Sequence, residues 1–209
     1  MATLLHPTER PVILCDVSWA SYESLLSDGG DQRGSRMAYL DGVLEIMTPT
    51  FEHEHIKAVA QAIVETILRC AGRDYLCAGS TTFRREDVVR GFEADVSFYI
   101  ANVARVRPLT RIDLTRDPPP DLVIEVDLTH GSLDKFPIYA ALAVPEVWRF
   151  SGSQALIYEL SDGDYVESER SATMPQLSAQ QLTAFIQAGL RQPRPDLERD
   201  IETWTGGER

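Results

Sequence analysis

Acidic side chains alternate with apolar ones along a short segment in the middle of the chain. In residues 121–127 the acids Asp121, Glu125 and Asp127 fall at odd positions, and the even positions are all apolar. Because side chains alternate between the two faces of a strand, the three acids share one face. Grouped carboxylates repel one another and are costly to bury unpaired. The pattern indicates either a divalent-cation site or an edge strand with one solvated face.

Two neighbouring features favour the cation site. Asp95 stands at the entry of another predicted strand, 94–100, and Lys135 lies just inside the next predicted helix. The lysine is close enough in sequence to fold back over the end of the strand 121–127. Hard cations such as Mg²⁺ take oxygen ligands and often need only one or two carboxylates, together with water and substrate phosphate. We therefore expect Asp95 and Glu125 to meet at one cation, with Lys135 nearby.

The clearest predicted helix, at about 51–70, contributes another acid. Its apolar residues recur at the helical spacing of ~100° per residue, and Glu52 falls within their stripe. His53 and His55 flank the stripe, and Glu54 points away from it. We therefore expect Glu52 to point inward at the helix N-terminus, where the helix dipole favours an anion. A capping acid in the first turn is the alternative.

The elements that must position these residues are a mixture of helices and strands. The chain begins with a predicted helix at 17–28 and a hairpin at 35–47 that turns at Asp41-Gly42. Further strands are predicted in 75–86, 94–100, 146–150, 155–160 and 164–170, and further helices at about 134–144 and at 178–190. This order predicts one α/β domain over 1–190. The polar remainder, 191–209, is expected to be a mobile tail.

Several of these segments together resemble a known group of nucleases. The quoted stretches are GVLEIM, FEHEH, FEADVSFYI and PPPDLVIEVDLTHGSLDKFPIYAALAVPEVW. They resemble the PD-(D/E)XK nuclease superfamily and, more closely, its Uma-two family of restriction endonuclease-like proteins, over residues 36–170. The resemblance implies a single-domain restriction-endonuclease-like fold, with a mixed central sheet flanked by helices. It also implies Mg²⁺-dependent hydrolysis of phosphodiester bonds in nucleic acid, with DNA as the expected substrate and Mn²⁺ as an alternative metal.

Residue by residue, the resemblance assigns most of the superfamily motif. Asp95 matches its first aspartate and Glu125 its second acid, while Ala94 replaces the proline that precedes the aspartate. The superfamily lysine would stand at position 127, where this chain has Asp127. The family resemblance displaces that lysine onto the next helix, to Lys135. Asp127 is then either a third metal ligand or a repulsive neighbour.

These assignments define the expected site. The expected catalytic residues are Asp95, Glu125, Lys135 and Glu52. The expected metal ligands are Asp95, Glu125 and Asp127. The residues expected to support the ligands from outside are Glu45, His53 and Glu93. Trp148 and Tyr139 are expected to be structural, with Tyr139 packed beneath Lys135.

Composition limits the partners and keeps a second function class open. The formal net charge is −12, which argues against a constitutive, tight nucleic-acid binder but allows a local and transient grip. The competing class is therefore a non-catalytic, nuclease-like interaction module. A group of arginines is a candidate basic rim around the cleft, although an ordinary solvated surface is the simpler interpretation. They are Arg84, Arg85, Arg90, Arg105, Arg107, Arg111 and Arg116.

Other properties of the chain set expectations about its surroundings. No apolar run approaches the ~20 residues that span a membrane, the N-terminus lacks the features of a signal peptide, and three cysteines stand at irregular spacing. These features predict a cytoplasmic protein with reduced thiols. A homodimer is expected because twofold dimers are the commonest soluble oligomers. The apolar strand 155–160 and the helix 178–190 are the surfaces nominated for it.

Overall fold

A computed structural model describes residues 11–30, 34–128 and 133–207, and in these ranges the strands form two sheets. The larger sheet has six strands in the order β11-β10-β9-β8-β7-β4, and the smaller has five in the order β1-β3-β2-β6-β5. The six strands of the larger sheet are β4 (Leu76–Gly79), β7 (Val96–Tyr99), β8 (Leu122–Asp127), β9 (Glu146–Ser151), β10 (Gln154–Ser161) and β11 (Asp164–Ser168). The strands of the smaller sheet are β1 (Val12–Leu14), β2 (Arg36–Leu40), β3 (Val43–Met47), β5 (Thr82–Arg85) and β6 (Arg90–Glu93).

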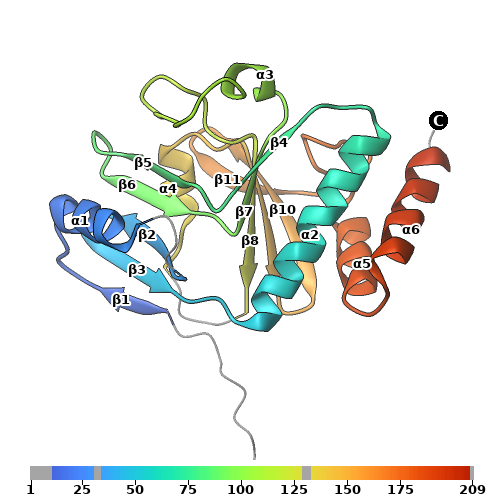
Figure 1. The fold of residues 1–209 in the computed structure, drawn as a ribbon, viewed down its shortest axis with the longest axis horizontal. Helices are drawn as coiled ribbons and strands as arrows, with labels where there is room; N and C mark the ends of the chain where they lie inside the picture. The colour runs from blue at the N-terminus through green and yellow to red at the C-terminus, as the bar shows by residue number, and fades with distance from the viewer. Residues whose placement is uncertain (1–10, 31–33, 129–132, 208–209) are drawn as a thin grey trace, which may run out of the picture.

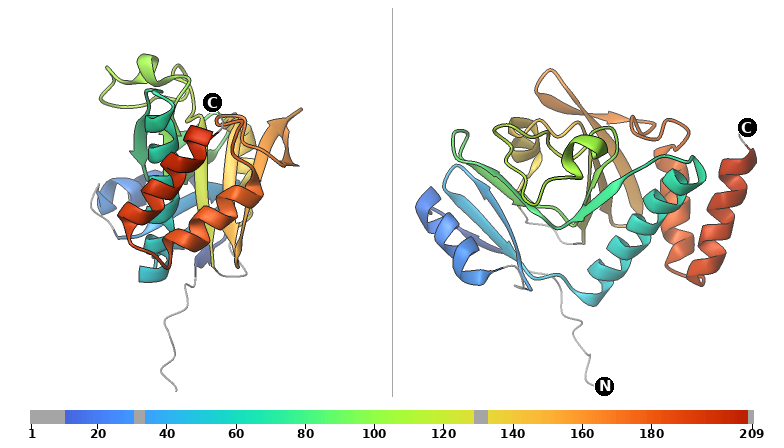
Figure 2. Two further views of the ribbon diagram at one scale, coloured as in Figure 1. Left: turned by 90° about the vertical axis from the view of Figure 1, so that its right-hand side faces the viewer. Right: turned by 45° about the horizontal axis from the view of Figure 1, so that its top comes forward.

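Helices cover both faces of the larger sheet (Figures 1 and 2). On one face lie α2, α5 and α6, and on the other lie α4 and the smaller sheet with α1. The helices in the described ranges are α1 (Trp19–Gly29), α2 (Phe51–Cys70), α3 (Val103–Val106), α4 (Phe136–Ala141), α5 (Ala179–Gly189) and α6 (Arg194–Gly207). The expected α/β architecture, a mixed central sheet flanked by helices, is therefore confirmed.

Strand β8 lies inside the larger sheet. It pairs antiparallel with β7 and parallel with β9, and α4 lies on the crossover between β8 and β9. Its even positions pack against α2 in one core cluster, whereas Val123 packs with Tyr139 and Val147 in the core on the opposite face. The alternation expected from the sequence is present, but both faces are buried. The edge-strand interpretation is therefore wrong, and Glu125 needs an internal partner.

Helix α2 has the bounds expected for it, 51–70. Thr50 adopts an extended backbone and its hydroxyl accepts the N–H of His53 at 3.3 Å. The helix ends at Cys70, and Gly72 follows with φ +62°, a conformation that glycine adopts at little cost. This geometry fixes the first turn of α2 beside the larger sheet.

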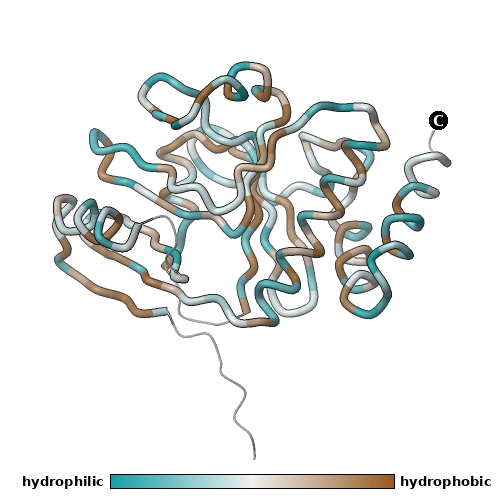
Figure 3. The backbone as a smooth tube through the Cα atoms, viewed as in Figure 1, coloured by the Kyte–Doolittle hydropathy of each residue, from teal (hydrophilic) through white to brown (hydrophobic). Residues whose placement is uncertain are grey.

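The C-terminal segment differs from its expectation. Residues 194–207 form α6, whose Leu197 and Ile201 are fully buried and whose Trp204 packs edge-on against Phe185 at 5.5 Å between ring centroids. Figure 3 shows α6 as mainly hydrophilic, so the few apolar residues at helical spacing carry the packing. The expectation of a mobile tail is wrong for this helix. The segment is polar on average, but Leu197, Ile201 and Trp204 form a narrow apolar stripe along the helix.

The sequence pattern predicts no element at residues 90–93, which form strand β6 between β2 and β5. None of the helices in the described ranges combines the length and apolar character needed to cross a membrane.

Candidate active site

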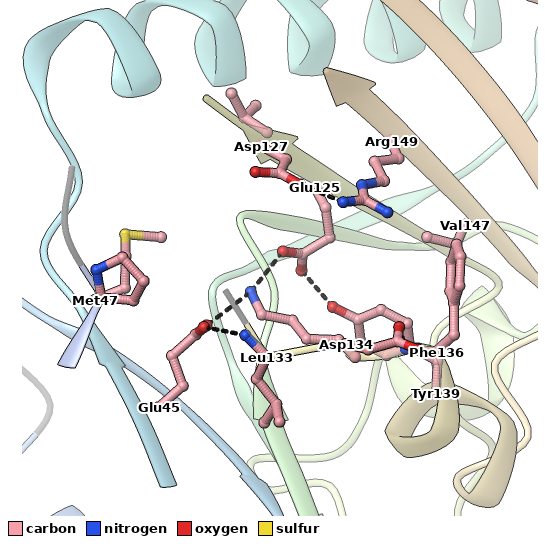
Figure 4. A pocket seen from close by; sticks show the side chains of 13 residues that line it. Glu45, Met47, Glu125, Asp127, Leu133, Asp134, Phe136, Tyr139, Val147 and Arg149 are labelled. Atoms are coloured by element: carbon pink, nitrogen blue, oxygen red, sulfur yellow. Dashed lines mark hydrogen bonds and ion pairs between the residues drawn. The ribbon is translucent and has the colours of Figure 1, made fainter. Parts of the chain in front are cut away.

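A cavity of about 170 Å³ opens at the carboxyl end of β8 (Figure 4). Its walls come from both sheets and from α4 with the residues just before it. The charged side chains among its lining residues are Glu45, Glu125, Asp127, Asp134, Lys135 and Arg149. A cavity that gathers four acids and two bases at the end of a core strand is the strongest candidate for a functional site in the described ranges.

Lys135 lies over the end of β8, as expected. It is the N-cap residue of α4, and its Nζ lies 2.8 Å from Oε2 of Glu125 and 3.6 Å from Oε1 of Glu45. Tyr139, one turn further along α4, donates its hydroxyl to Oε1 of Glu125 at 2.7 Å. Glu45 is held from its other oxygen by the backbone N–H of Leu133 at 2.7 Å. One short helix therefore fixes both oxygens of Glu125.

The charge states at this cluster follow from burial and proximity. Burial lowers the pKa of Lys135, but the carboxylates of Glu125, Glu45 and Asp95 outweigh it and raise that pKa above its ordinary value. Burial also raises the pKa of Tyr139 well above its ordinary value, and Glu125 adds to the effect. Lys135 is thus a fixed cation at neutral pH and Tyr139 a neutral donor. Neither is suited to act as a general base.

The surroundings of Glu125 disfavour its charged form. Its side chain is 8% exposed. Burial raises its pKa, Lys135 opposes that effect and Asp95 adds to it, so that the pKa stands above its ordinary value. A carboxylate held charged in this setting attracts cations.

Asp95 is held by three elements of the fold. Its Oδ1 lies 2.8 Å from Nε2 of His53 on α2 and also contacts Arg36 on β2, and its Oδ2 accepts the backbone N–H of Val126 at 2.7 Å. It is 1% exposed. Burial acts to raise its pKa, but His53, Arg36 and Lys135 lower it below the ordinary value. Asp95 is therefore ionised, and His53 contacts it from α2; the role of His53 as a support for a metal ligand stays a prediction.

The first turn of α2 is rotated relative to the expectation. Glu52 is exposed, so the prediction that it points inward is wrong. His53 is fully buried instead, and Glu54 is half-buried in an ion pair with Arg36 at 2.5 Å. Positions 52 and 53 lie roughly 40° and 60° to either side of Ile56 at ~100° per residue. Spacing alone could not choose between them, whereas Asp95 and Arg36 provide partners on the His53 side.

The remaining expected acids have separate roles. Asp127 forms an ion pair with Arg149 of β9. In the parallel pairing of β8 and β9, Arg149 lies directly opposite Glu125. Glu93 accepts the backbone N–H of Met37 at 2.8 Å and does not line the cavity. Asp121 accepts the backbone N–H of Ile100 at 2.6 Å, so it organises the start of β8.

Most arginines of the expected basic rim form ion pairs with acids outside the cavity. Arg84 binds Glu23, Arg85 binds Asp87, Arg90 binds Asp41, Arg107 binds Asp74 and Arg116 binds Asp113. The interpretation as ordinary surface charge therefore holds for these residues. The arginines that contact the acids of the candidate site are Arg36 and Arg149, which sequence reasoning missed. Arg149 is placed beside Glu125 by the register of β8 and β9, and Arg36 reaches Asp95 and Glu54 from β2. Neither relation is visible before strand pairing and packing are known.

The acids of the candidate site carry the oxygen ligands that a hard divalent cation takes. In the ranges that the structure describes, no three His, Cys, Asp or Glu side chains lie together as a metal cluster. A Mg²⁺ site needs only one or two carboxylates, however. A carboxylate has about four acceptor positions; Glu125 uses two and Asp95 three in the contacts above. Both therefore keep an acceptor position, so their chemistry suits a hard cation. Asp95 is 1% exposed, however, and it is not among the residues that line the cavity.

Comparisons with known proteins agree with the fold. Among solved structures, the chain is similar to "a putative nuclease belonging to DUF820" from Anabaena variabilis, with a TM-score of 0.50 and 13% identity. The match covers 72% of this chain and 90% of that one, and at such identity it shows a shared fold alone. No curated protein matches the chain. The profile of the Uma2 family, described as "Putative restriction endonuclease", matches residues 19–191. Because that match spans most of the chain, the protein belongs to the Uma2 family, as the motifs predicted.

Proposed function

We propose that the chain is an endonuclease that hydrolyses phosphodiester bonds in nucleic acid, with DNA as the substrate and Mg²⁺ as the metal, replaceable by Mn²⁺. The observation that carries the proposal is the buried contact of 2.8 Å between Lys135 and Glu125, beside the ionised Asp95. Two acids and a lysine in one place are the parts that metal-dependent phosphodiester hydrolysis uses. Membership of the family supports the same activity.

Glu125 and Asp95 would hold the cation. When bound, a divalent ion lowers the pKa of water and stabilises negative charge on phosphoryl oxygens. Lys135, which stays protonated, orients an attacking water or offsets the charge that develops on the phosphate. Tyr139 fixes the rotamer of Glu125 through its hydroxyl hydrogen bond. His53 supports the metal-binding geometry through its contact with Asp95.

A second candidate, a non-catalytic interaction module with a nuclease-like fold, is favoured by one observation. The charge of Asp95 is already balanced by Arg36, and that of Glu125 by Lys135. A site that has become inactive would be stabilised by such internal pairs without a metal.

Cleavage of nucleic acid separates the two candidates. Purified protein is incubated with single-stranded DNA, duplex DNA and RNA, with and without Mg²⁺ or Mn²⁺. The nuclease proposal expects divalent-dependent cleavage that Glu125→Ala abolishes and that Arg116→Met, a change at an exposed ion pair, leaves intact. If wild-type protein cleaves none of these substrates, the interaction module is supported. Calorimetry adds a second readout, because Asp95→Ala and Glu125→Ala should each weaken binding of Mn²⁺.

A homodimer remains part of the proposal, with a changed surface. The nominated strand 155–160 lies within β10, which is paired on both sides by β9 and β11. The nominated helix corresponds to α5, whose apolar residues pack inside the chain's own core. Both edges of β10 and the buried apolar residues of α5 are thus used within the described part of the chain, so we expect a dimer to use another face. Light scattering at micromolar concentration tests the dimer, and a cytoplasmic location stays a prediction.

A further inference from the structure

We infer that Arg149 binds a phosphate group of the nucleic-acid strand in the β8 cavity, and that Asp127 positions its guanidinium. The inference rests on the proposed function, because it names a substrate contact at the same site. It also gives Asp127, which stands where the superfamily motif has a lysine, a role other than metal ligand.

The geometry places Arg149 at the reaction site. It lies directly beside Glu125 in the parallel register of β8 and β9, and it lines the cavity. Figure 4 shows its guanidinium next to Asp127 at the cavity wall. Its side chain is 39% exposed and that of Asp127 is 17% exposed. The guanidinium is therefore held on its protein side while part of it stays open to solvent.

The bonding of Arg149 leaves donors for a ligand. A guanidinium has five N–H donors. In the described ranges Arg149 donates through Nη2 to one oxygen of Asp127 and has no second acceptor. By contrast, Arg85, Arg90 and Arg116 each bind their aspartate through two nitrogens. In the described ranges, Arg149 thus keeps N–H donors available beside the acids of the site.

Phosphate is the ligand that this arrangement fits. Arginine is always charged and its planar fork matches two phosphate oxygens. Burial lowers the pKa of Arg149, but Asp127 raises it above its ordinary value, so the guanidinium stays positively charged. The cavity lining carries four carboxylates against two cations, so a divalent ion would bring it to neutrality. An anionic phosphate would then have favourable contacts from Arg149 and from the metal.

The test measures binding separately from cleavage. A fluorescein-labelled single-stranded oligonucleotide is titrated into the full chain at several salt concentrations, with Ca²⁺ present. Arg149→Met should weaken binding roughly tenfold to a hundredfold, as expected for a lost hydrogen bond to a charged group. It should also lower the slope of log affinity against log salt by about 0.7, the value for one phosphate contact on a single strand. Inorganic phosphate should compete with the oligonucleotide less effectively in this variant.

Controls keep the test specific. Arg116→Met, at another Asp-paired arginine, should leave affinity and slope unchanged. If Arg149→Met folds poorly because Asp127 loses its partner, the double change Asp127→Asn/Arg149→Met removes both charges and should show the same loss. Asp127→Asn alone should keep the salt slope of wild type, since the arginine charge remains, and should keep calorimetric Mn²⁺ affinity within about twofold, a change worth less than half a kcal/mol.

Three results would overturn the inference. Unchanged affinity and slope in Arg149→Met would remove the phosphate contact. Equal losses in Arg116→Met would show a general charge effect. A loss of Mn²⁺ affinity in Asp127→Asn as large as in Glu125→Ala would make Asp127 a ligand. Oligonucleotide binding that depends on Arg149 without any cleavage would refute the proposed nuclease activity and leave this inference standing.

Discussion

Replacing Lys135 by methionine should expose how much of the fold depends on one buried cation. Methionine keeps most of the aliphatic stem and removes the ammonium. Glu125 and Glu45 are 8% and 2% exposed, and Lys135 is the cation within 4 Å of both. The variant therefore leaves two buried carboxylates without a counter-ion.

The size of the effect follows from those partners. Removing one member of a buried ion pair typically costs 3–5 kcal/mol. Tyr139 and the N–H of Leu133 continue to donate to the two carboxylates, so we expect the lower end, ~3 kcal/mol. For a chain of this size that corresponds to a fall in melting temperature of roughly 6–12 °C.

Urea unfolding at neutral pH measures the change, with thermal melts as a check. The double change Glu125→Gln/Lys135→Met should recover part of the loss, because glutamine carries no buried charge. Arg116→Met serves as the control, since its exposed ion pair contributes little. A loss below 1 kcal/mol in Lys135→Met, or no recovery in the double variant, would refute the reasoning that the ammonium balances Glu125.

Three further predictions use the same structure. Once divalent-dependent cleavage is established, Lys135→Met should lower the cleavage rate about 10²–10³-fold. Mn²⁺ affinity, measured by calorimetry, should be kept, because an ammonium is no metal ligand. Full activity in this variant would reject the assignment of Lys135 as the displaced motif lysine. The lowered pKa of Asp95 stabilises the folded state at pH values above the pKa of an unfolded aspartate, about 3.9, and this stability is lost as pH falls through the folded pKa. Asp95→Asn should therefore flatten the acid side of a curve of unfolding free energy against pH, measured by urea unfolding. A curve that keeps its wild-type shape would count against the ion pair. Trp148 is 1% exposed, so Trp148→Ala should cost about 3–5 kcal/mol in urea unfolding, and an unchanged midpoint would show that the residue is not packed.

Local patterns predicted several of the contacts around Glu125. Alternation along 121–127 predicted which side chains share a face with Glu125, and the short distance in sequence predicted that Lys135 returns to it. Both are local relations, decided by strand geometry and by the start of one helix. The membership of the family and the α/β class were also predicted from the motifs.

What failed depends on contacts between distant segments. The choice between Glu52 and His53 was decided by Asp95, just before β7, and by Arg36 on β2, neither of which could be placed by helical spacing. The ion pair of Asp127 with Arg149 was also missed, because the parallel register of β8 and β9 brings that partner near; whether Asp127 is a metal ligand stays a prediction. Tertiary pairing, not propensity, settled these residues.

The bridge that Lys135 makes between Glu125 and Glu45 joins the two sheets, since Glu125 belongs to β8 and Glu45 to β3. We therefore expect positions 45, 125 and 135 to be coupled during evolution. A lineage that loses the lysine keeps two buried charges until one acid is also replaced. We expect sequences of relatives to change these positions together, and a relative that keeps both acids should carry a cation that reaches the same point from another element.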